Sequence, residues 1–169
     1  METGADDLAE ACLSHLAREE DTLRATLETL QEVRGAALSG DVRRLETLHA
    51  RQDEAARLTE AMREEREYLR SRIAKLLRIK SGEATLEKLA IHLGESPNGT
   101  LLVAARRVRE LASRVQQICL SNATVLEYCL GFTRRVLRDI TGGGTPAESY
   151  GPDGMVMESP CGPLLSARG

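Results

Sequence analysis

The sequence has very few aromatic residues and no tryptophan. Aromatics make up 2% of its 169 residues. A compact core with several layers normally draws much of its buried area from aromatic side chains. Leu, Ala, Val and Ile must supply the packing here, which is typical of long helical coils.

Motifs of catalysis and cofactor binding are also missing. The chain has no GxxxxGK[ST], GxGxxG, GxSxG or HExxH pattern, and its four cysteines form no CxxC pair. Glu46 and His49 make one Glu-x-x-His pair, whereas a di-iron bundle uses two such pairs and two further glutamates. We therefore expect no enzymatic activity, no metal and no cofactor.

Long apolar runs are absent as well. No stretch of about 18 apolar residues occurs, and the first nine residues carry three acids and no base, which argues against a signal peptide or a membrane-spanning helix. We expect a cytoplasmic protein without stable membrane insertion. The formal net charge is −3 with both signs abundant, so the cationic stretch Met62–Lys80 indicates a solvated, salt-bridged helix face rather than a nucleic-acid surface.

Apolar residues recur at helical spacing through most of the chain. The pattern predicts a first helix over Asp6–Leu38, capped by Asp6 or Asp7. Ser39-Gly40-Asp41 predicts a helix stop followed by a new N-cap. The second helix, over Asp41–Ile79 and ended by Ser81-Gly82, should therefore fold back as an antiparallel hairpin.

The longest helical pattern runs from Leu101 to Ile140, where apolar and small residues recur at alternating steps of four and three. This alternation keeps one stripe on one side of the helix throughout. Forty helical residues span roughly 60 Å, so the helix must lie along other helices, in its own chain or in another protein. A short helical turn over Thr85–Leu93 and a loop containing Pro97 are expected before it.

Residues 141–169 differ from the rest of the chain. They contain seven of the 14 glycines and four of the five prolines, and they show no periodicity, which predicts a flexible Gly/Pro-rich tail. We expect an all-α protein, an elongated antiparallel helical hairpin or coiled coil with a long third helix. Its helical domain should cover residues 6–140, with the tail over 141–169.

One strip of the long helix is the best candidate for binding a partner protein. Its members lie at helical spacing and are apolar except for a single asparagine, which would fix register. The pattern leaves open whether this strip contacts a partner or packs inside the bundle. The strip consists of Leu111, Val115, Ile118, Asn122, Val125, Leu126, Cys129 and Phe132.

The order of these parts resembles the FlgN-type flagellar export chaperones, over roughly Ala9 to Ala167. Ser121–Leu126 is similar to an Asn-containing stretch in the last long helix of that family. Tyr150-Gly-Pro-Asp-Gly154 resembles the family's Tyr-Gly-x-x-Gly element beyond that helix, and Leu164-Leu165 resembles the short apolar end of its tail.

The resemblance implies a cytosolic type III secretion chaperone of flagellum biogenesis. Such a chaperone binds the C-terminal helical segments of hook–filament junction proteins (the hook-associated proteins), prevents their premature assembly and delivers them to the export gate. It implies that Tyr150 and Gly154 dock on the cytoplasmic domain of the gate. Two alternatives stay open: a structural coiled-coil scaffold or weak homodimer, and a regulatory adaptor that binds an RNA polymerase factor or nucleic acid through Met62–Lys80.

Overall fold

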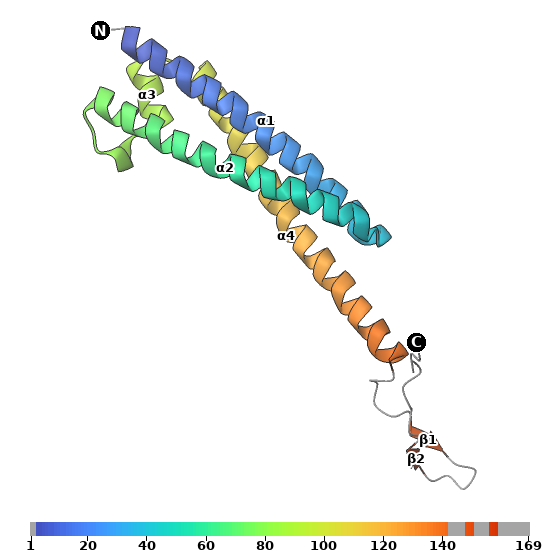
Figure 1. Ribbon diagram of the computed structural model, residues 1–169. Coiled ribbons are helices and arrows are strands. Elements are labelled where there is room, and N and C mark those ends of the chain that lie inside the picture. The colour runs from blue at the N-terminus through green and yellow to red at the C-terminus, as the bar shows by residue number, and fades with distance from the viewer. Residues whose placement is uncertain (1–2, 142–147, 151–155, 159–169) are drawn as a thin grey trace. The chain divides into compact units, whose positions relative to one another are not determined.

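The computed structural model describes residues 3–141, 148–150 and 156–158 (Figure 1). The predicted all-α fold is confirmed, because nearly all of these residues are helical. The chain divides into two compact units, Met1–Ala123 and Thr124–Gly169, and the boundary lies within the last helix. The elements are α1 (Thr3–Ser39), α2 (Val42–Leu77), the 3-10 turn η1 (Ser81–Glu83), α3 (Leu86–His92), α4 (Thr100–Ile140), β1 (Glu148–Tyr150) and β2 (Val156–Glu158).

Helices α1 and α2 form the predicted antiparallel hairpin (Figure 1). Gly40 ends α1 with a φ of 69°, a left-handed conformation that glycine adopts without strain. The Asp41 side chain then caps α2 by accepting a hydrogen bond of 3.0 Å from the backbone N–H of Arg44. The predicted cap of α1 is wrong, because that helix already begins at Thr3 and Asp6 lies within its first turn.

The end of α2 also differs from the prediction. The helix stops at Leu77, and Arg78 takes the left-handed position with φ 54° and ψ 42°. The sequence pointed instead to Ser81-Gly82, since glycine is the usual residue at such a stop. The short helix predicted near residue 85 is confirmed as α3, which Thr85 caps by accepting from the backbone N–H of Lys88 at 3.2 Å.

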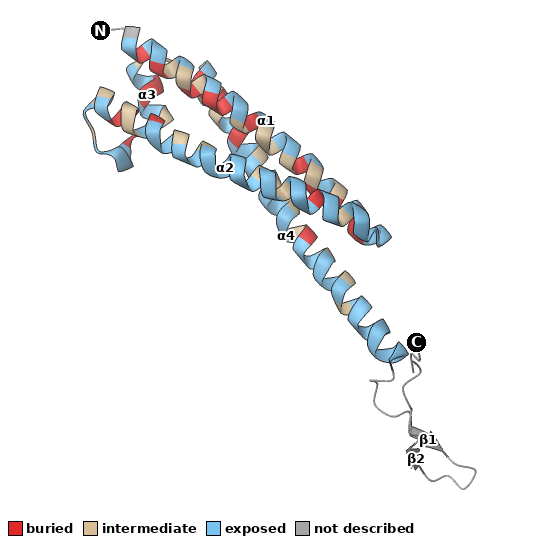
Figure 2. Ribbon diagram, viewed as in Figure 1, coloured by how far each residue is buried: buried red, intermediate tan, exposed pale blue. Residues whose placement is uncertain are grey.

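The main hydrophobic core lies where α3 and the start of α4 meet the hairpin (Figure 2). Leu8 of α1, Leu89 of α3 and Leu101 of α4 are almost completely buried in it. A smaller cluster forms near the hairpin turn around Leu48. Apart from Cys12, the core consists of aliphatic side chains, as the scarcity of aromatics predicts; its other buried members are Cys12, Leu16, Leu69, Ile73, Ala74, Ala84, Ala90, Ala104 and Val108.

Two short strands occur in the region predicted to be a flexible tail. β1 and β2 pair antiparallel, with Glu148 opposite Glu158 and Tyr150 opposite Val156. Three-residue strands are too short to produce a readable alternation of apolar and polar residues, so the sequence does not predict them. The turn expected at Pro152–Gly154 lies outside the described residues, as do 142–147 and 159–169.

Candidate partner-binding surface on α4

Helix α4 begins as a core helix. Leu101, Ala104 and Val108 are buried against the other helices of the first unit. Further along the same face, Leu111, Val115 and Ile118 are only half-buried. The stripe predicted from the sequence is therefore partly covered within the first unit.

A polar contact joins α4 to α1 near the end of that covered part. The Asn122 side chain is 3% exposed and donates from Nδ2 to the backbone carbonyl of Leu30, at 2.6 Å. Beside it, Arg34 donates to the hydroxyl of Ser121 at 3.2 Å. Asn122 Oδ1 has no hydrogen-bond partner among the described residues. Client contact through Asn122 would first require this bond to break.

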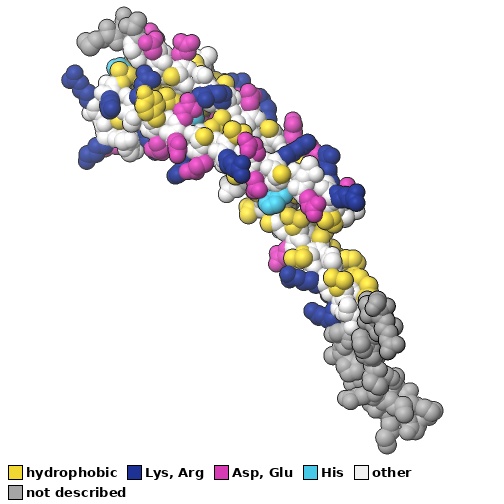
Figure 3. Space-filling model, in the orientation of Figure 1, with side chains coloured by type: hydrophobic (Ala, Val, Ile, Leu, Met, Phe, Trp, Pro, Cys, Tyr) yellow, Lys and Arg dark blue, Asp and Glu magenta, His cyan; other side chains and the backbone are white. Residues whose placement is uncertain are grey.

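The same stripe continues beyond Asn122 with little cover. In the second unit, Leu126 is 39% exposed and Phe132 is 56% exposed, while Val125 and Cys129 are half-buried. The spacing of three and four keeps these residues on one face of the helix. Figure 2 shows this part of α4 mostly in the exposed colour, and Figure 3 shows hydrophobic side chains gathered on it. Tyr128, Leu130, Val136, Leu137 and Ile140 are also exposed.

We define the distal strip as Val125, Leu126, Cys129, Phe132, Val136 and Ile140. Large apolar groups that lie together on a surface commonly mark a binding site. The charged residues Arg134, Arg135 and Arg138 lie on the other side of the helix, so this segment is amphipathic. An amphipathic helix with an uncovered apolar stripe is suited to pack against another helix.

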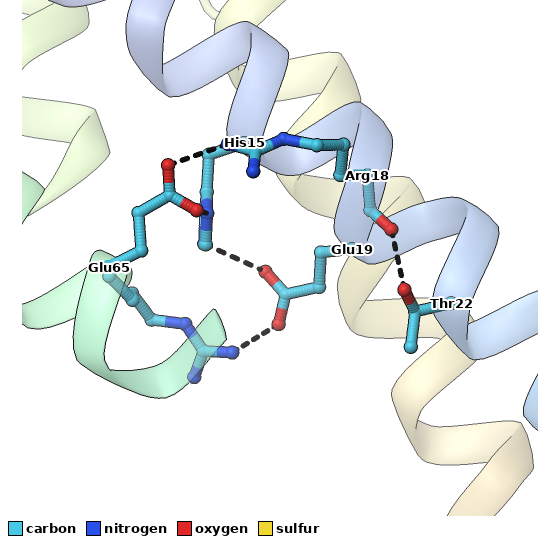
Figure 4. A network of polar contacts seen from close by, with 6 residues as sticks. His15, Arg18, Glu19, Thr22 and Glu65 are labelled. Atoms are coloured by element: carbon cyan, nitrogen blue, oxygen red, sulfur yellow. Dashed lines mark hydrogen bonds and ion pairs between the residues drawn. The ribbon is translucent and has the colours of Figure 1, made fainter. Parts of the chain in front are cut away.

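A network of charged side chains joins α1 to α2 (Figure 4). Glu65 of α2 accepts from Arg18 at 2.6 Å and lies 3.0 Å from Nδ1 of the buried His15. The hydrogen bond from Arg18, followed by that from His15, lowers the pKa of the Glu65 carboxyl. On the other side of the imidazole, Glu19 lies 3.6 Å from Nε2 and forms an ion pair with Arg66. The network holds the hairpin together and was not predicted, because no local pattern links residues about 50 positions apart.

The cysteines occupy different environments. Cys12 is buried, and burial raises the pKa of its thiol to about 11, partly offset by the charge of Arg72. Cys119 is exposed. Within the described part of the chain, no three His, Cys, Asp or Glu side chains are placed to hold a metal ion. Glu46 and His49 are both exposed, and the expectation that the chain binds no metal or cofactor stays a prediction.

Comparison with known proteins decides the family. The model of the FlgN protein family matches residues 1–157. The chain belongs to the FlgN family. No curated protein and no solved structure gives a significant match.

The FlgN family assignment confirms the resemblance and gives the general function, that of a chaperone in flagellar protein export. FlgN proteins are not known as enzymes. The family therefore favours the chaperone interpretation over a scaffold or a regulatory adaptor. No helix within residues 3–141 has the combination of length and hydropathy that crossing a lipid bilayer requires.

The matched region of this FlgN chain includes the two residues expected to dock on the export gate. The backbone of Tyr150 lies at the end of β1, paired with Val156. Gly154 lies outside the described residues. Docking through Tyr150 and Gly154 stays a prediction.

Proposed function

We propose that this protein is a cytosolic chaperone whose distal strip on α4 binds the C-terminal helical segment of a hook–filament junction protein. One observation carries the proposal: the stripe that is buried at Leu101 and half-buried at Val115 continues, on the same face, to the exposed Leu126 and Phe132. The first part of the stripe stabilises the chaperone itself. The second part is available to a client.

The physical chemistry of the strip suits a helical client. A client helix with an apolar stripe would pack lengthwise on α4. The contacting residues of both helices would be spaced by three and four positions. Burying a Leu-sized side chain contributes about 1.5–3 kcal/mol before ordering costs. Four or five such contacts are enough for micromolar to nanomolar binding. Covering the client's stripe also prevents its early association with other subunits.

The second part of the proposal concerns delivery. We propose that Tyr150 and Gly154 dock on the cytoplasmic domain of the export gate, with Tyr150 as the aromatic contact. An aromatic side chain beside a turn loses little conformational freedom when it enters a pocket. The pairing of Tyr150 with Val156 supports this proposal because a paired backbone limits the positions the tyrosine must search.

The choice of client segment tests the proposal directly. The full chain is titrated calorimetrically with an intact junction protein and with the same protein lacking its C-terminal helical segment. We expect the intact protein to bind at micromolar or better affinity and the shortened one to show no measurable binding. Equal binding of both would show that the chaperone recognises another part of the client.

A further inference from the structure

A concave surface lies in the first unit. It is lined by α1, α2 and α4, by the start of α3 with the two residues before it, and by Pro97. We call it the α2–α4 groove; its volume is about 810 Å³. Leu16 of α1, Ile73 of α2 and Val108 of α4 contribute buried apolar surface to it, and the half-buried Leu86 and Leu102 add more. Neither the client nor the gate interaction proposed above uses this groove.

The lining has the form of a slot for a helix. Along α1 it runs from Cys12 to Glu19, along α2 from Arg66 to Ile73, and along α4 from Leu102 to Ala112. These stretches correspond to about 10–15 Å of helix. On the α4 wall, Ala105 and Ala112 are small enough to let another helix approach closely. The three long helices and the start of α3 thus leave an open groove with room for one more helix.

The charges along the groove are distributed unevenly. On the α1 and α2 side, Arg66 is paired with Glu19, and Arg70 with Glu67. The start of α3 adds one exposed carboxylate, that of Glu87. On the α4 side, Arg106 donates only to neutral groups, the Pro97 carbonyl at 3.2 Å and the Asn98 side chain at 3.3 Å.

Arg109, one turn further along α4, is exposed and has no hydrogen-bond or ion-pair partner within the part of the chain that the structure describes. The α4 wall therefore carries two cations, Arg106 and Arg109, without a carboxylate partner among those residues. This wall favours a ligand with negative charge along one edge.

The groove lies mostly on a different face of α4 from the stripe, and Val108 belongs to both. With 3.6 residues per turn, Ala105, Arg109 and Ala112 lie roughly a third of a turn around α4 from Leu111, Val115 and Ile118. A ligand in the groove therefore uses mostly a different face of the helix. We propose that the α2–α4 groove is a second docking site that takes an amphipathic α-helix of another protein, with an apolar face toward the floor and acidic side chains toward Arg106 and Arg109.

A pair of designed peptides tests both the shape and the charge. Each is an 18-residue labelled helix with leucines spaced by four and three; one has glutamates along one edge and the other has lysines there. Binding to the full chain is followed by fluorescence anisotropy. We expect the Glu peptide to bind roughly tenfold more tightly than the Lys peptide, since two rim ion pairs are worth about that factor.

Variants connect the binding to the groove. Arg106→Glu/Arg109→Glu should reverse the preference between the peptides, while Arg134→Glu/Arg135→Glu, the same charge change on the distal part of α4, should leave it unchanged. Ala112→Trp, at an exposed position on the wall, should reduce binding of the Glu peptide at least tenfold with unchanged circular dichroism. This variant leaves the Arg106 contacts to residues 97–98 intact.

Three results would overturn the proposal. The first is equal binding of the two peptides or binding of neither. The second is a preference that survives both groove variants. The third is concentration-dependent self-association of the parent chain, measured by sedimentation equilibrium, that disappears in Ala112→Trp, because the groove would then be an interface between two copies of this chain.

Discussion

Asn122 on α4 donates a hydrogen bond of 2.6 Å to the backbone carbonyl of Leu30 on α1. The bond lies at the last turn of α4 within the first compact unit, which ends at Ala123. An amide in this position fixes the register of two helices, because a shift by one residue would leave it buried without an acceptor.

The chemistry of this contact can be tested at Asn122 itself. Asn122→Ala should lower the free energy of unfolding by about 1 kcal/mol, a typical value for one lost hydrogen bond. Asn122→Asp should lower the free energy of unfolding further, by about 3 kcal/mol, because it places a carboxylate against the Leu30 carbonyl in a buried site. Urea denaturation measures both. An Asp variant as stable as the parent would show that the contact does not form.

The network around Glu65 predicts a dependence of stability on pH. The pKa of the Glu65 carboxyl is lowered in the folded state. The ionised carboxylate therefore stabilises the fold above the ordinary carboxyl pKa of about 4.3, and this contribution is lost as the pH falls below that value. Glu65→Gln should remove this contribution, worth less than about 1 kcal/mol because the side chain is 36% exposed and screened.

The measurement compares urea midpoints between pH 3 and pH 7. The parent should lose more stability on acidification than Glu65→Gln does, and the difference should shrink in high salt. The neighbouring, exposed Glu64 serves as a matched control, and Glu64→Gln should follow the parent. Parallel curves for the parent and Glu65→Gln would contradict the assigned network.

Cys12 and Cys119 should react differently with thiol reagents. The pKa of Cys12 is raised to about 11 by burial, so at pH 8 its thiol is protonated and covered, whereas Cys119 is exposed. Iodoacetamide at pH 8 should modify Cys119 at least tenfold faster than Cys12, with both equally reactive in urea. Peptide mass spectrometry distinguishes the two sites. The raised pKa means that folding favours the protonated thiol of Cys12. The stability that this thiol contributes should therefore be lost as the pH rises from about 9 through 11.

Tyr150 provides a test of delivery that is separate from client binding. Tyr150→Ala should weaken binding to the cytoplasmic domain of the export gate by about 1–3 kcal/mol, a typical loss for an aromatic hot spot. Affinity for the client should not change, and Tyr150→Phe, which keeps the ring, should retain most of the gate affinity. Calorimetry with the isolated gate domain measures the effect. Equal gate affinity of Tyr150→Ala and the parent would remove this residue from the proposed docking site.

The sequence predicted the regular parts of the fold well, for a physical reason. Helical periodicity and the Gly40-Asp41 break are local signals, so the hairpin and the long helix could be read from neighbouring residues. The stop at Arg78 could not, because a left-handed residue other than glycine has no composition signal.

The candidate surface was only partly predictable. Spacing placed Asn122, Leu126 and Phe132 on one stripe, but spacing alone does not show where that stripe is covered. Asn122 is buried against α1, whereas Leu126 and Phe132 are exposed. The contact between His15 and Glu65 and the α2–α4 groove likewise arise from tertiary packing between distant segments, which leaves no motif in the sequence.

Charge introduced into the distal strip tests directly whether this part of α4 binds the client. We compare Leu126→Asp/Phe132→Asp with Leu58→Asp/Ile91→Asp, which places the same two charges at exposed apolar positions on α2 and α3. Both variants and the parent are titrated calorimetrically with the C-terminal helical segment of a junction protein, and circular dichroism is recorded for each.

We expect the distal-strip variant to lose at least a hundredfold in affinity. The free energy needed to desolvate two carboxylates against an apolar helix is far larger than the free energy that the remaining contacts supply. The control variant should bind as the parent does, and all three proteins should keep the same helicity. Undiminished binding by Leu126→Asp/Phe132→Asp would show that the distal strip does not bind the client. A loss of helicity that parallels the loss of binding would show that the strip is part of the core.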